Sequence, residues 1–443
     1  MMPSQHVSTA LGAGAPVGTL HTASRAEVVA HQLDRLRGGL RRVLAGNRFY
    51  QHKLAGCDIG ALESLDSVRR LPFTTKAELV ADQQAHPLYG TNLSFPLRDY
   101  VRLHQTSGTT GQPLKILDTA ESWEWWAACW ETVYTAAGVS VDDIVYLAFS
   151  FGPFIGFWSA YEGAKRVGAL VVPGGGQTSL QRLRAIRETE TTVLVCTPTY
   201  ALHLAELASQ EGFDLASSTV RVTIHAGEPG ASIPNTRRRI ESSWGARAYD
   251  HIGMTEMGAY AFTCLEQHAV HVNEPEFIAE ILDPISGQPV AEGERGELVL
   301  TNLGRWGAPA LRYRTRDVVQ RGPASCPCGR TTLTLPGGVL GRVDDMLIVR
   351  GVNIYPAGIE DVLRGIPGVA EFRITLRTAG ALDEIALEVE CADVVAPQVE
   401  SALRQALGLR VPVQAVAAGA LPRFELKARR VVDLRGTAAP NEA

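Results

Sequence analysis

The residues best suited to chemistry form one short stretch that is rich in hydroxyl groups and glycines. Its members are Thr106, Ser107, Gly108, Thr109, Thr110 and Gly111. Glycines let the backbone turn with positive φ and bring N–H groups against phosphate oxygens, and the hydroxyl groups donate further hydrogen bonds. A Walker loop needs Lys and then Ser or Thr after its last glycine, but Gln112 and Pro113 follow here. The stretch therefore suits a polyphosphate, although such a turn is more often an ordinary solvated loop.

Cysteines and a histidine form a second group, one with metal-ligand chemistry. The candidate ligands are Cys264, His271, Cys326 and Cys328. Thiolates and an imidazole suit tetrahedral Zn²⁺, and a closed set of such ligands leaves no open position for a substrate. A metal there would therefore fasten a loop rather than take part in catalysis. His268 is a competing imidazole, and buried cysteines without a metal are common.

Length and composition indicate a two-domain globular protein. The chain has 443 residues, of which 45% are hydrophobic and 20% charged, and its net charge is −5. This length exceeds what one core normally organises, so we expect a large domain and a smaller one. The negative charge argues against nucleic acid as the main partner. No apolar run is long enough to span a bilayer and no signal peptide is recognisable, so we expect a cytoplasmic protein without a membrane partner, whose seven cysteines form no disulfide framework.

The pattern of apolar residues predicts an α/β fold. Helical spacing marks residues 26–44, 122–137, 156–167 and 180–188, and short β-branched runs mark residues 144–148, 169–173, 192–196 and 220–225. This alternation predicts a buried, mostly parallel sheet. Active sites in such sheets lie at the carboxyl ends of strands. The hydroxyl-rich loop, residues 226–228 and the segment around Gly253 are each expected directly after a strand.

The chain is expected to divide into a tail and two domains. Residues 1–22, rich in small and polar residues, are expected to form a disordered tail. The large domain is expected over residues 23–341 and a small, mobile α+β domain over residues 342–443. In the small domain the pattern predicts strands at 346–349, 372–377 and 385–391, a loop with Gly351, and helices from 357 and over 397–407. A charged turn at residues 342–344 would be the hinge, the alternative being an ordinary acidic turn.

Five segments of the chain occur in the order found in one family. They are the loop at 106–115, Ile252-Gly253-Met254-Thr255-Glu256, Tyr313-Arg314-Thr315-Arg316-Asp317, the stretch from Gly341 to Glu360, and Leu421-Pro422-Arg423-Phe424-Glu425-Leu426-Lys427. Together they resemble the adenylate-forming enzymes, and the last two are most similar to the phenylacetate-CoA ligase branch. The resemblance extends over roughly residues 70 to 433. It therefore concerns the whole chain rather than one motif.

The resemblance implies an acid–thiol ligase that works in two steps. ATP, with Mg²⁺, first converts a carboxylate into an acyl-adenylate and pyrophosphate, and the thiol of coenzyme A then takes the acyl group. The first step needs positive charge where negative charge develops. The resemblance assigns this role to Lys427, although Phe424-Glu425-Leu426 stands where the family usually has Ser-Glu-Gly.

The resemblance also implies the nucleotide contacts. Glu256 would hold Mg²⁺ and Thr255 would touch phosphate. Asp317 would accept both ribose hydroxyl groups, and Arg342 would donate to the sugar. Further contacts are expected from the hydroxyl-rich loop and from Gly227, Glu228 and Gly253.

Two departures from the family concern the nucleotide. Ile252 stands where relatives usually place a Tyr that stacks on adenine, and Gln112 replaces a loop Lys, which leaves Lys115 as a displaced substitute. We therefore expect weaker nucleotide affinity than in typical members, or an aromatic face supplied by Tyr249 instead.

The acid-binding pocket is expected beside an aromatic segment that begins a helix. Its expected lining residues are Ser150, Phe151, Phe154, Phe157, His225, Ala226, Met254 and Gly258. Aromatic walls beside small residues favour a flat ring, so the expected substrate is a small aromatic carboxylic acid. His251 is a further polar candidate, and the alternative for the aromatic segment is plain core packing.

The resemblance leaves alternatives open. One alternative acceptor is the phosphopantetheine thiol of a carrier protein, which has the same chemistry as coenzyme A. A catalytically silent nucleotide-binding protein is the non-enzyme alternative, and Thr255, Glu256, Asp317 and Lys427 argue against it. Some phenylacetate-CoA ligase relatives carry a Cys, a His and a Cys-x-Cys at comparable places, which favours the structural Zn²⁺. The sequence does not decide whether the chain forms a homodimer.

Overall fold

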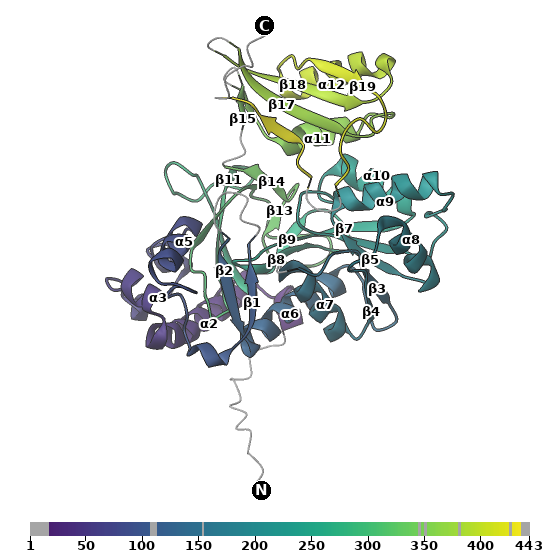
Figure 1. The fold of residues 1–443 in the computed structure, drawn as a ribbon. Coiled ribbons are helices and arrows are strands. Elements are labelled where there is room, and N and C mark those ends of the chain that lie inside the picture. Colours follow the sequence, from purple (N-terminus) through teal and green to yellow (C-terminus); the bar gives the residue numbers. More distant parts are fainter. Residues whose placement is uncertain are drawn as a thin grey trace.

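The chain folds into a large N-terminal domain with a smaller C-terminal domain seated above it (Figure 1). The computed structural model describes residues 17–106, 113–152, 155–343, 347–349, 352–379, 382–424 and 428–435. The predicted class, an α/β large domain with mixed sheets and a small α+β domain, is confirmed. None of the described helices combines the length and the apolar character needed to cross a lipid bilayer.

The central sheet of the large domain positions most of the candidate site. Its strands are β3 (Ile144–Leu147), β4 (Leu170–Pro173), β5 (Val193–Cys196), β6 (Val222–His225), β7 (Arg247–Met254), β8 (Gly258–Thr263), β9 (Val270–Val272) and β13 (Thr334–Leu335). Within the described residues their order is β13-β9-β8-β7-β6-β5-β3-β4. The part from β4 to β7 is parallel, as predicted, and β7, β8, β9 and β13 pair antiparallel. Strands β5 and β6 are buried at every residue, which explains their unbroken apolar runs.

Helices cover both faces of this sheet (Figure 1). They are α6 (Ala120–Ala136), α7 (Ile155–Val167), α8 (Ser179–Glu188), α9 (Pro198–Gln210) and α10 (Pro234–Trp244). Threonine side chains cap the starts of α6, α8 and α9, which is why these helices begin where the strands end. Helix α7 lies against α6, where a Cβ added at Gly163 would meet Trp130 at 2.3 Å.

The rest of the large domain is a helical N-terminal layer and two further sheets. The helical elements are α1 (Val17–Leu20), α2 (Arg25–Gly46), α3 (Arg48–Lys53), η1 (Ile59–Ala61), α4 (Leu65–Val68), α5 (Lys76–Ala85) and η2 (Leu97–Asp99). A hairpin joins β1 (Tyr100–Gln105) to β2 (Lys115–Thr119), and an antiparallel sheet contains β10 (Phe277–Leu282), β11 (Arg295–Asn302), β12 (Tyr313–Gln320) and β14 (Val339–Arg342). Residues 17–22, expected in the tail, are folded instead: Leu20 and His21 are buried, and Thr331 donates its backbone N–H to the His21 carbonyl.

The small domain has its own core. Its elements are β15 (Leu347–Val349), β16 (Val352–Ile354), α11 (Pro356–Arg364), β17 (Phe372–Ala379), β18 (Leu382–Glu390), η3 (Asp393–Val395), α12 (Ala396–Leu407), β19 (Val413–Val416) and β20 (Val431–Asp433). The sheet order is β19-β18-β17-β20 among the described strands. The loop expected around Gly351 contains a strand, because residues 352–354 pair back on β15 as a short hairpin. Gly351 and the expected hinge residue Asp344 lie outside the described residues.

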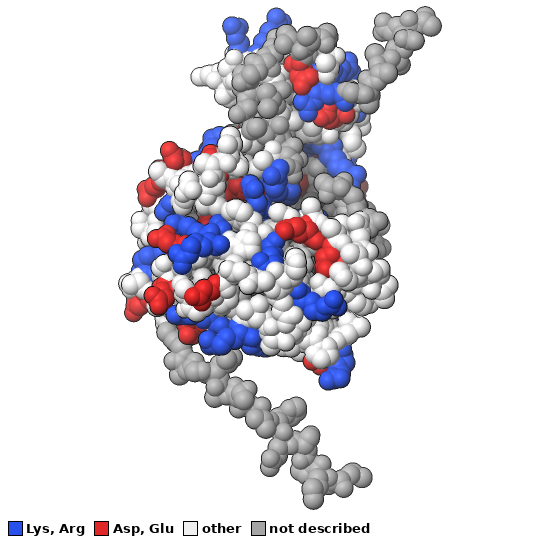
Figure 2. Space-filling view, turned by 90° about the vertical axis from the view of Figure 1, so that its left-hand side faces the viewer, with Lys and Arg blue, Asp and Glu red and all other residues white. Residues whose placement is uncertain are grey.

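The two domains touch through α10 and α11. Asn235 at the start of α10 bonds Asp361 of α11 through its backbone N–H at 3.1 Å and its side chain at 2.8 Å. Arg239 donates to the Val369 carbonyl at 2.7 Å. The side view in Figure 2 shows basic and acidic side chains interspersed over the large domain, as expected from the modest net charge of −5.

Candidate functional site

The β1–β2 hairpin carries the hydroxyl-rich loop. Thr106 is buried and closes the base of the loop: its backbone N–H donates to the Leu114 carbonyl at 3.0 Å, and its hydroxyl oxygen accepts from Leu114 N–H at 3.0 Å. The predicted contacts Ser107, Gly108, Thr109, Thr110 and Gly111 lie outside the described residues, as does Gln112. Lys115, considered as a substitute cation, directs its ammonium group to the Leu88 carbonyl at 3.4 Å and lies above the Tyr89 ring.

A buried carboxylate lies at the turn between β7 and β8. Glu256 is 7% exposed and its Oε1 accepts a hydrogen bond from the Tyr313 hydroxyl at 3.3 Å. The ammonium group of Lys76 lies 3.4 Å from the same oxygen. Burial and the charge of Glu256 raise the pKa of Tyr313 far above its usual value, so the phenol keeps its proton and donates it. Gly253, expected just after a strand, lies within β7, because the strand changes partner from β6 to β8 and continues to Met254.

A buried arginine braces this turn. Arg305 donates from Nε and one terminal nitrogen to the two oxygens of Asp118 on β2, both at 2.6 Å, and from the other nitrogen to the Thr255 carbonyl at 2.5 Å. The Arg305 and Asp118 side chains are fully buried, and Trp126 covers the guanidinium group. Arg305 therefore fixes the Thr255 turn relative to the hairpin with the hydroxyl-rich loop. The sequence gives no signal for either Arg305 or Lys76, because isolated cations are ordinary surface residues in most proteins.

A second carboxylate lies on β12. Asp317 is 7% exposed, its Oδ2 accepts from the Tyr260 hydroxyl at 3.2 Å, and Arg342 of β14 lies 3.9 Å from Oδ1. The register of β12 and β14 pairs Asp317 directly with Arg342, so the structure brings these two predicted residues together. Tyr313, which bonds Glu256, and Asp317 lie on the same strand β12, and Tyr260, which bonds Asp317, lies on β8 just after the turn that holds Glu256. The two predicted carboxylates thus belong to one site.

Gly227 and Glu228 follow β6, as predicted. Gly227 has φ of 97°, which favours glycine, and is exposed. The carboxylate of Glu228 accepts the Thr199 backbone N–H at 3.0 Å and the Ala428 backbone N–H at 2.9 Å, so both its oxygens bind protein backbone and one bond crosses to the small domain. Burial raises the pKa of Glu228. Lys427, the neighbour of Ala428 in sequence, lies outside the described residues.

Three of the predicted pocket residues lie against aromatic rings. Phe157 stacks on Phe149 at 3.9 Å, and Phe151 meets Trp158 edge-on at 4.9 Å. Trp125 and Phe277 pack closely on Gly258, since an added Cβ would lie 3.1 Å from both rings, closer than an ordinary contact. Ser150 is exposed, Ala226 and Met254 are half-buried, and Phe154 lies outside the described residues.

Two other candidates do not take the expected place. His225 is fully buried and is held by Thr223 at 2.9 Å and by the Cys196 carbonyl at 3.3 Å, and burial lowers its pKa to about 4. It therefore belongs to the sheet core rather than to a pocket wall. Tyr249 is 1% exposed and offers no open face to a base in this structure.

His251 is the better-placed imidazole. It stacks on Trp130 with ring centroids 4.0 Å apart, and neither ring nitrogen has a hydrogen-bond partner among the described residues. Burial lowers the pKa of His251 to about 3, so the ring is neutral at pH 7. A neutral imidazole can donate from one nitrogen and accept at the other.

The four candidate metal ligands converge. The ligand atoms of Cys264, His271, Cys326 and Cys328 all lie within 4.8 Å of one another. The Cys264 and Cys326 sulfurs are 3.9 Å apart, and Cys328 Sγ is 3.6 Å from His271 Nε2. Tetrahedral Zn²⁺ with ordinary bond lengths would separate two sulfurs by about 3.8 Å and a sulfur from a nitrogen by about 3.6 Å. The residues therefore fit this metal.

The choice between the two histidines follows from the same geometry. Nδ1 of His271 lies 3.1 Å from the Thr332 hydroxyl, which orients the ring so that Nε2 faces the sulfurs. Burial lowers the pKa of His271 to about 4, and a neutral ring is the form that binds metals. His268 is exposed and does not belong to the cluster.

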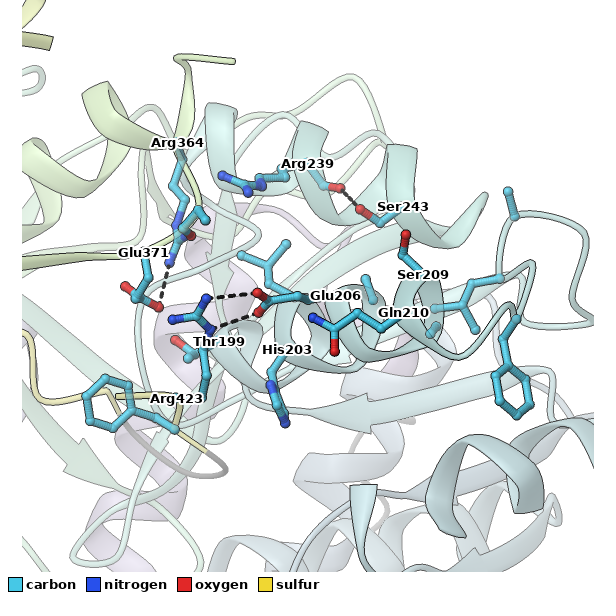
Figure 3. Close-up of a pocket in the computed structure, with 18 of the residues that line it drawn as sticks. Thr199, His203, Glu206, Ser209, Gln210, Arg239, Ser243, Arg364, Glu371 and Arg423 are labelled. Atoms are coloured by element: carbon cyan, nitrogen blue, oxygen red, sulfur yellow. Dashed lines mark hydrogen bonds and ion pairs between the residues drawn. The ribbon is translucent and has the colours of Figure 1, made fainter. Parts of the chain in front are cut away.

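A cavity of about 550 Å³ lies elsewhere, at the domain interface (Figure 3). Its walls come from α9, α10 and the small domain, and ion pairs of Arg423 with Glu206 and of Arg364 with Glu371 border it. Neither Glu256 nor Asp317 lines it. The cavity marks the seam between the domains rather than the site described above.

Comparisons with family models and with known proteins point to the same family. Residues 9–304 match the family model described as AMP-binding enzyme, and residues 351–435 match the AMP-binding enzyme C-terminal domain. The chain is 33% identical to phenylacetate-coenzyme A ligase of Escherichia coli, over 94% of this chain and 97% of that protein. It is 31% identical to phenylacetate-coenzyme A ligase of Thermus thermophilus, over 94% and 98%.

The similarity to solved structures depends on the conformational state of the solved enzyme. A 2-hydroxyisobutyryl-CoA ligase in the postadenylation state, 29% identical, superposes with a TM-score of 0.89 over 97% of this chain and 95% of that chain. The thioesterification state of the ligase of the same name, 30% identical, gives 0.72 over 98% and 95%. The present domain orientation is therefore more similar to the postadenylation arrangement.

Proposed function

This chain belongs to the family of AMP-binding enzymes, and on that premise we propose that it converts a small aromatic carboxylic acid into its coenzyme A thioester through an acyl-adenylate. ATP-dependent activation of an acid followed by transfer to a thiol is the activity of an AMP-forming acid–thiol ligase. The carrying observation is the shared site of Glu256 and Asp317: each carboxylate accepts a hydrogen bond from a tyrosine hydroxyl, and strand β12 carries both Asp317 and the tyrosine that bonds Glu256. One buried carboxylate suits a metal–phosphate group and the other suits a ribose diol.

The first step joins the acid to the nucleotide. A carboxylate oxygen of the acid attacks the α-phosphorus of ATP, the bond from that phosphorus to the bridging oxygen breaks, and the electron pair leaves with pyrophosphate. Asp317 and Arg342 would hold the ribose, and Thr255 with the loop from Thr106 would contact phosphates. Glu256 would hold Mg²⁺, which when bound neutralises phosphate charge. Lys427 is proposed as the cation that brings the acid and the α-phosphate together.

The second step transfers the acyl group. The thiol of coenzyme A loses its proton to solvent or a base, its sulfur attacks the acyl carbonyl, and AMP leaves with the electron pair of the broken carbon–oxygen bond. The thiol must reach the carbonyl from the side that the small domain covers in the first step, so the domain orientation is expected to change between the steps. We place the division between the domains after Arg342, since Arg342 ends a strand of the large domain and Leu347 begins the small-domain hairpin.

An aromatic acid is favoured by the surroundings of His251. Trp130 stacks on His251, Phe149 stacks on Phe157, and Trp125 and Phe277 pack closely on Gly258, so aromatic rings border these predicted pocket residues. The two unpaired nitrogens of His251 suit a polar substituent on such a ring, because a buried donor and acceptor without partners cost free energy until a ligand satisfies them.

We also propose a structural Zn²⁺ held by Cys264, His271, Cys326 and Cys328. The distances between their ligand atoms support it, and four protein ligands leave no open position for catalysis. The metal would tie the turn after β8 to the segment before β13.

A panel of aromatic carboxylic acids, scored by pyrophosphate release with and without coenzyme A, tests the proposed function. We expect at least one acid to give pyrophosphate, and the thioester to form only with coenzyme A. Pyrophosphate release with no transfer to coenzyme A would favour a carrier-protein thiol as the acceptor. Release with aliphatic acids alone would overturn the aromatic assignment, and no release with any acid would indicate a silent nucleotide-binding protein.

A further inference from the structure

The hydroxyl-rich loop supplies no positive charge of its own. Residues 106–113 contain neither Lys nor Arg, and the next cation, Lys115, donates to the Leu88 carbonyl at 3.4 Å. A polyphosphate carries several negative charges, and its departure as pyrophosphate concentrates that charge on the leaving oxygen. A cation for these phosphates must therefore come from another part of the chain.

Lys76 lies beside Glu256, the carboxylate proposed to hold Mg²⁺. Its Nζ is 3.4 Å from Oε1 of Glu256, and the lysine side chain is 37% exposed whereas the Glu256 side chain is 8% exposed. The Glu256 carboxylate is thus enclosed by protein, whereas the Lys76 ammonium group is partly in solvent at the end of a flexible side chain. A lysine in this setting can leave its carboxylate and turn toward a ligand without a large desolvation cost.

The backbone at Lys76 is held to the same strand as the rest of the site. The Thr74 N–H donates to the Arg312 carbonyl at 3.0 Å, and the Thr74 carbonyl accepts from the Arg314 N–H at 2.9 Å. These two bonds lie on either side of Tyr313. Tyr313 itself donates to the Glu256 oxygen that Lys76 approaches. Thr75 then caps α5 through a capping box with Glu78, so α5 begins at Lys76 in a fixed direction.

Two other cations near the site, Arg305 and Arg314, are already committed to buried partners. Arg305 is fully buried with Asp118, and Arg314 pairs with Glu297, whose side chain is 1% exposed. Moving either would leave a buried carboxylate without its counter-charge, which is costly. Lys76 differs because Mg²⁺ bound at Glu256 would replace its positive charge when Lys76 leaves that carboxylate.

We propose that Lys76 binds the two terminal phosphates of ATP and the departing pyrophosphate, in place of a lysine on the loop itself. Without nucleotide, Lys76 neutralises Glu256; with Mg²⁺ and ATP present, Glu256 serves the metal and Lys76 turns to the phosphates. Lys76 keeps its proton throughout: the electron pair of the broken bond stays on the pyrophosphate oxygen, which the ammonium group stabilises. This inference rests on the proposed function of the same site.

Ligand binding measured by calorimetry tests the proposal separately from turnover. In Lys76→Gln the affinity for pyrophosphate and for ATP with Mg²⁺ should fall about tenfold to a hundredfold, whereas the affinity for AMP, which lacks the terminal phosphates, should stay unchanged. Lys76→Arg should recover most of the loss, because the charge is restored. Lys165→Gln, which changes an exposed lysine of α7 paired with Glu162, is the matched control and should bind all three ligands like the wild type.

Two results would overturn the proposal. One is unchanged pyrophosphate binding in Lys76→Gln. The other is an equal loss of AMP and ATP binding with a lowered unfolding temperature, which would make Lys76 a structural residue. In the reaction itself, Lys76→Gln should slow pyrophosphate release and leave thioester formation from a supplied acyl-adenylate intact. If the wild type released no pyrophosphate with any acid, the proposed function would fail while the binding comparison would still decide the role of Lys76.

Discussion

The guanidinium group of Arg423 meets the carboxylate of Glu206 across the domain boundary, with two N–O distances of 2.8 Å (Figure 3). The same group also binds Glu390, which belongs to its own domain, at 2.9 and 2.8 Å. The Glu390 side chain is fully buried, whereas the Glu206 side chain is 38% exposed. When the domains separate, the buried Glu390 carboxylate keeps Arg423 as its partner, and only the exposed Glu206 carboxylate must be hydrated again. The contact is therefore a reversible clamp on the present orientation.

Removing the clamp should separate the two half-reactions. In Glu206→Gln we expect pyrophosphate release to slow several-fold while thioester formation from a supplied acyl-adenylate is retained or faster, because an orientation similar to the postadenylation state loses a contact. An exposed pair contributes about 1 kcal/mol or less, so the unfolding temperature should hardly change. Glu211→Gln, at the exposed end of α9, is the matched control. Equal effects on both half-reactions would contradict the clamp.

Lys427→Ala should reduce acyl-adenylate formation by roughly two to three orders of magnitude, the usual result of losing one preorganised charge at a transition state. Thioester formation from a supplied acyl-adenylate should survive, because that step does not need the charge at the α-phosphate. Pyrophosphate release and thioester formation, measured separately in one preparation, check both statements. Near-normal pyrophosphate release would remove Lys427 from the mechanism.

The metal proposal predicts about one Zn²⁺ per chain in protein purified without chelators. Cys328→Ser should lower metal content and the unfolding temperature together, since a structural site contributes folding free energy directly. Cys391→Ser, which changes a half-buried cysteine in the small domain, should alter neither. Elemental analysis that finds no metal in the wild type would contradict the proposed Zn²⁺ site.

Acid should weaken the small domain through Glu371. Burial alone would raise the pKa of Glu371, but hydrogen bonds and charge from Arg430, with Arg364 nearby, outweigh it and hold the pKa below the usual 4.5. A carboxyl with a depressed pKa contributes stability that is present above its usual pKa and is lost as the pH falls through its folded value.

The comparison of wild type with Glu371→Gln measures this contribution. At pH 7 the variant should lose about 3 kcal/mol of unfolding free energy, because a buried pair is broken. The gap should stay constant down to about pH 5 and narrow below 4.5, where the wild-type carboxyl becomes protonated in the unfolded chain. Urea unfolding at several pH values gives the gap, and a gap that widened in acid would show that the sign is wrong.

Local sequence patterns were sufficient for the parallel part of the fold. The helices α2, α6, α7 and α8 and the strands β3 to β6 lie within a few residues of the predicted ranges, because amphipathic spacing and buried β-branched runs are local signals. The sheet of β10, β11, β12 and β14 was not predicted. Its register depends on pairing between distant segments, such as Asp317 with Arg342, and no local pattern encodes such a pairing.

The same distinction applies to the site. Motif residues such as Glu256 and Asp317 were identified from their neighbours in sequence and are placed together by the fold. Lys76 has no local signal because it lies 180 positions before Glu256 in the chain, and tertiary contacts such as the bridge from Thr74 to Tyr313 bring it there. His225 is predicted as a polar contact of the acid-binding pocket, yet its side chain lies in the sheet core, where Thr223 and the Cys196 carbonyl bind its ring nitrogens.

The buried brace of Arg305 has a consequence for how the molecule opens. Arg305 and Asp118 have no solvent contact, so their bonds and the one to the Thr255 carbonyl cannot break unless the core around Trp126 opens as well. The seam at Arg423 and Glu206 needs no such event. Amide hydrogens of β7 next to Thr255 should therefore exchange with deuterium only through global unfolding, while those at the seam exchange through a smaller fluctuation. The small domain would thus change its orientation while the turn at Thr255 and strand β2 keep their positions relative to each other.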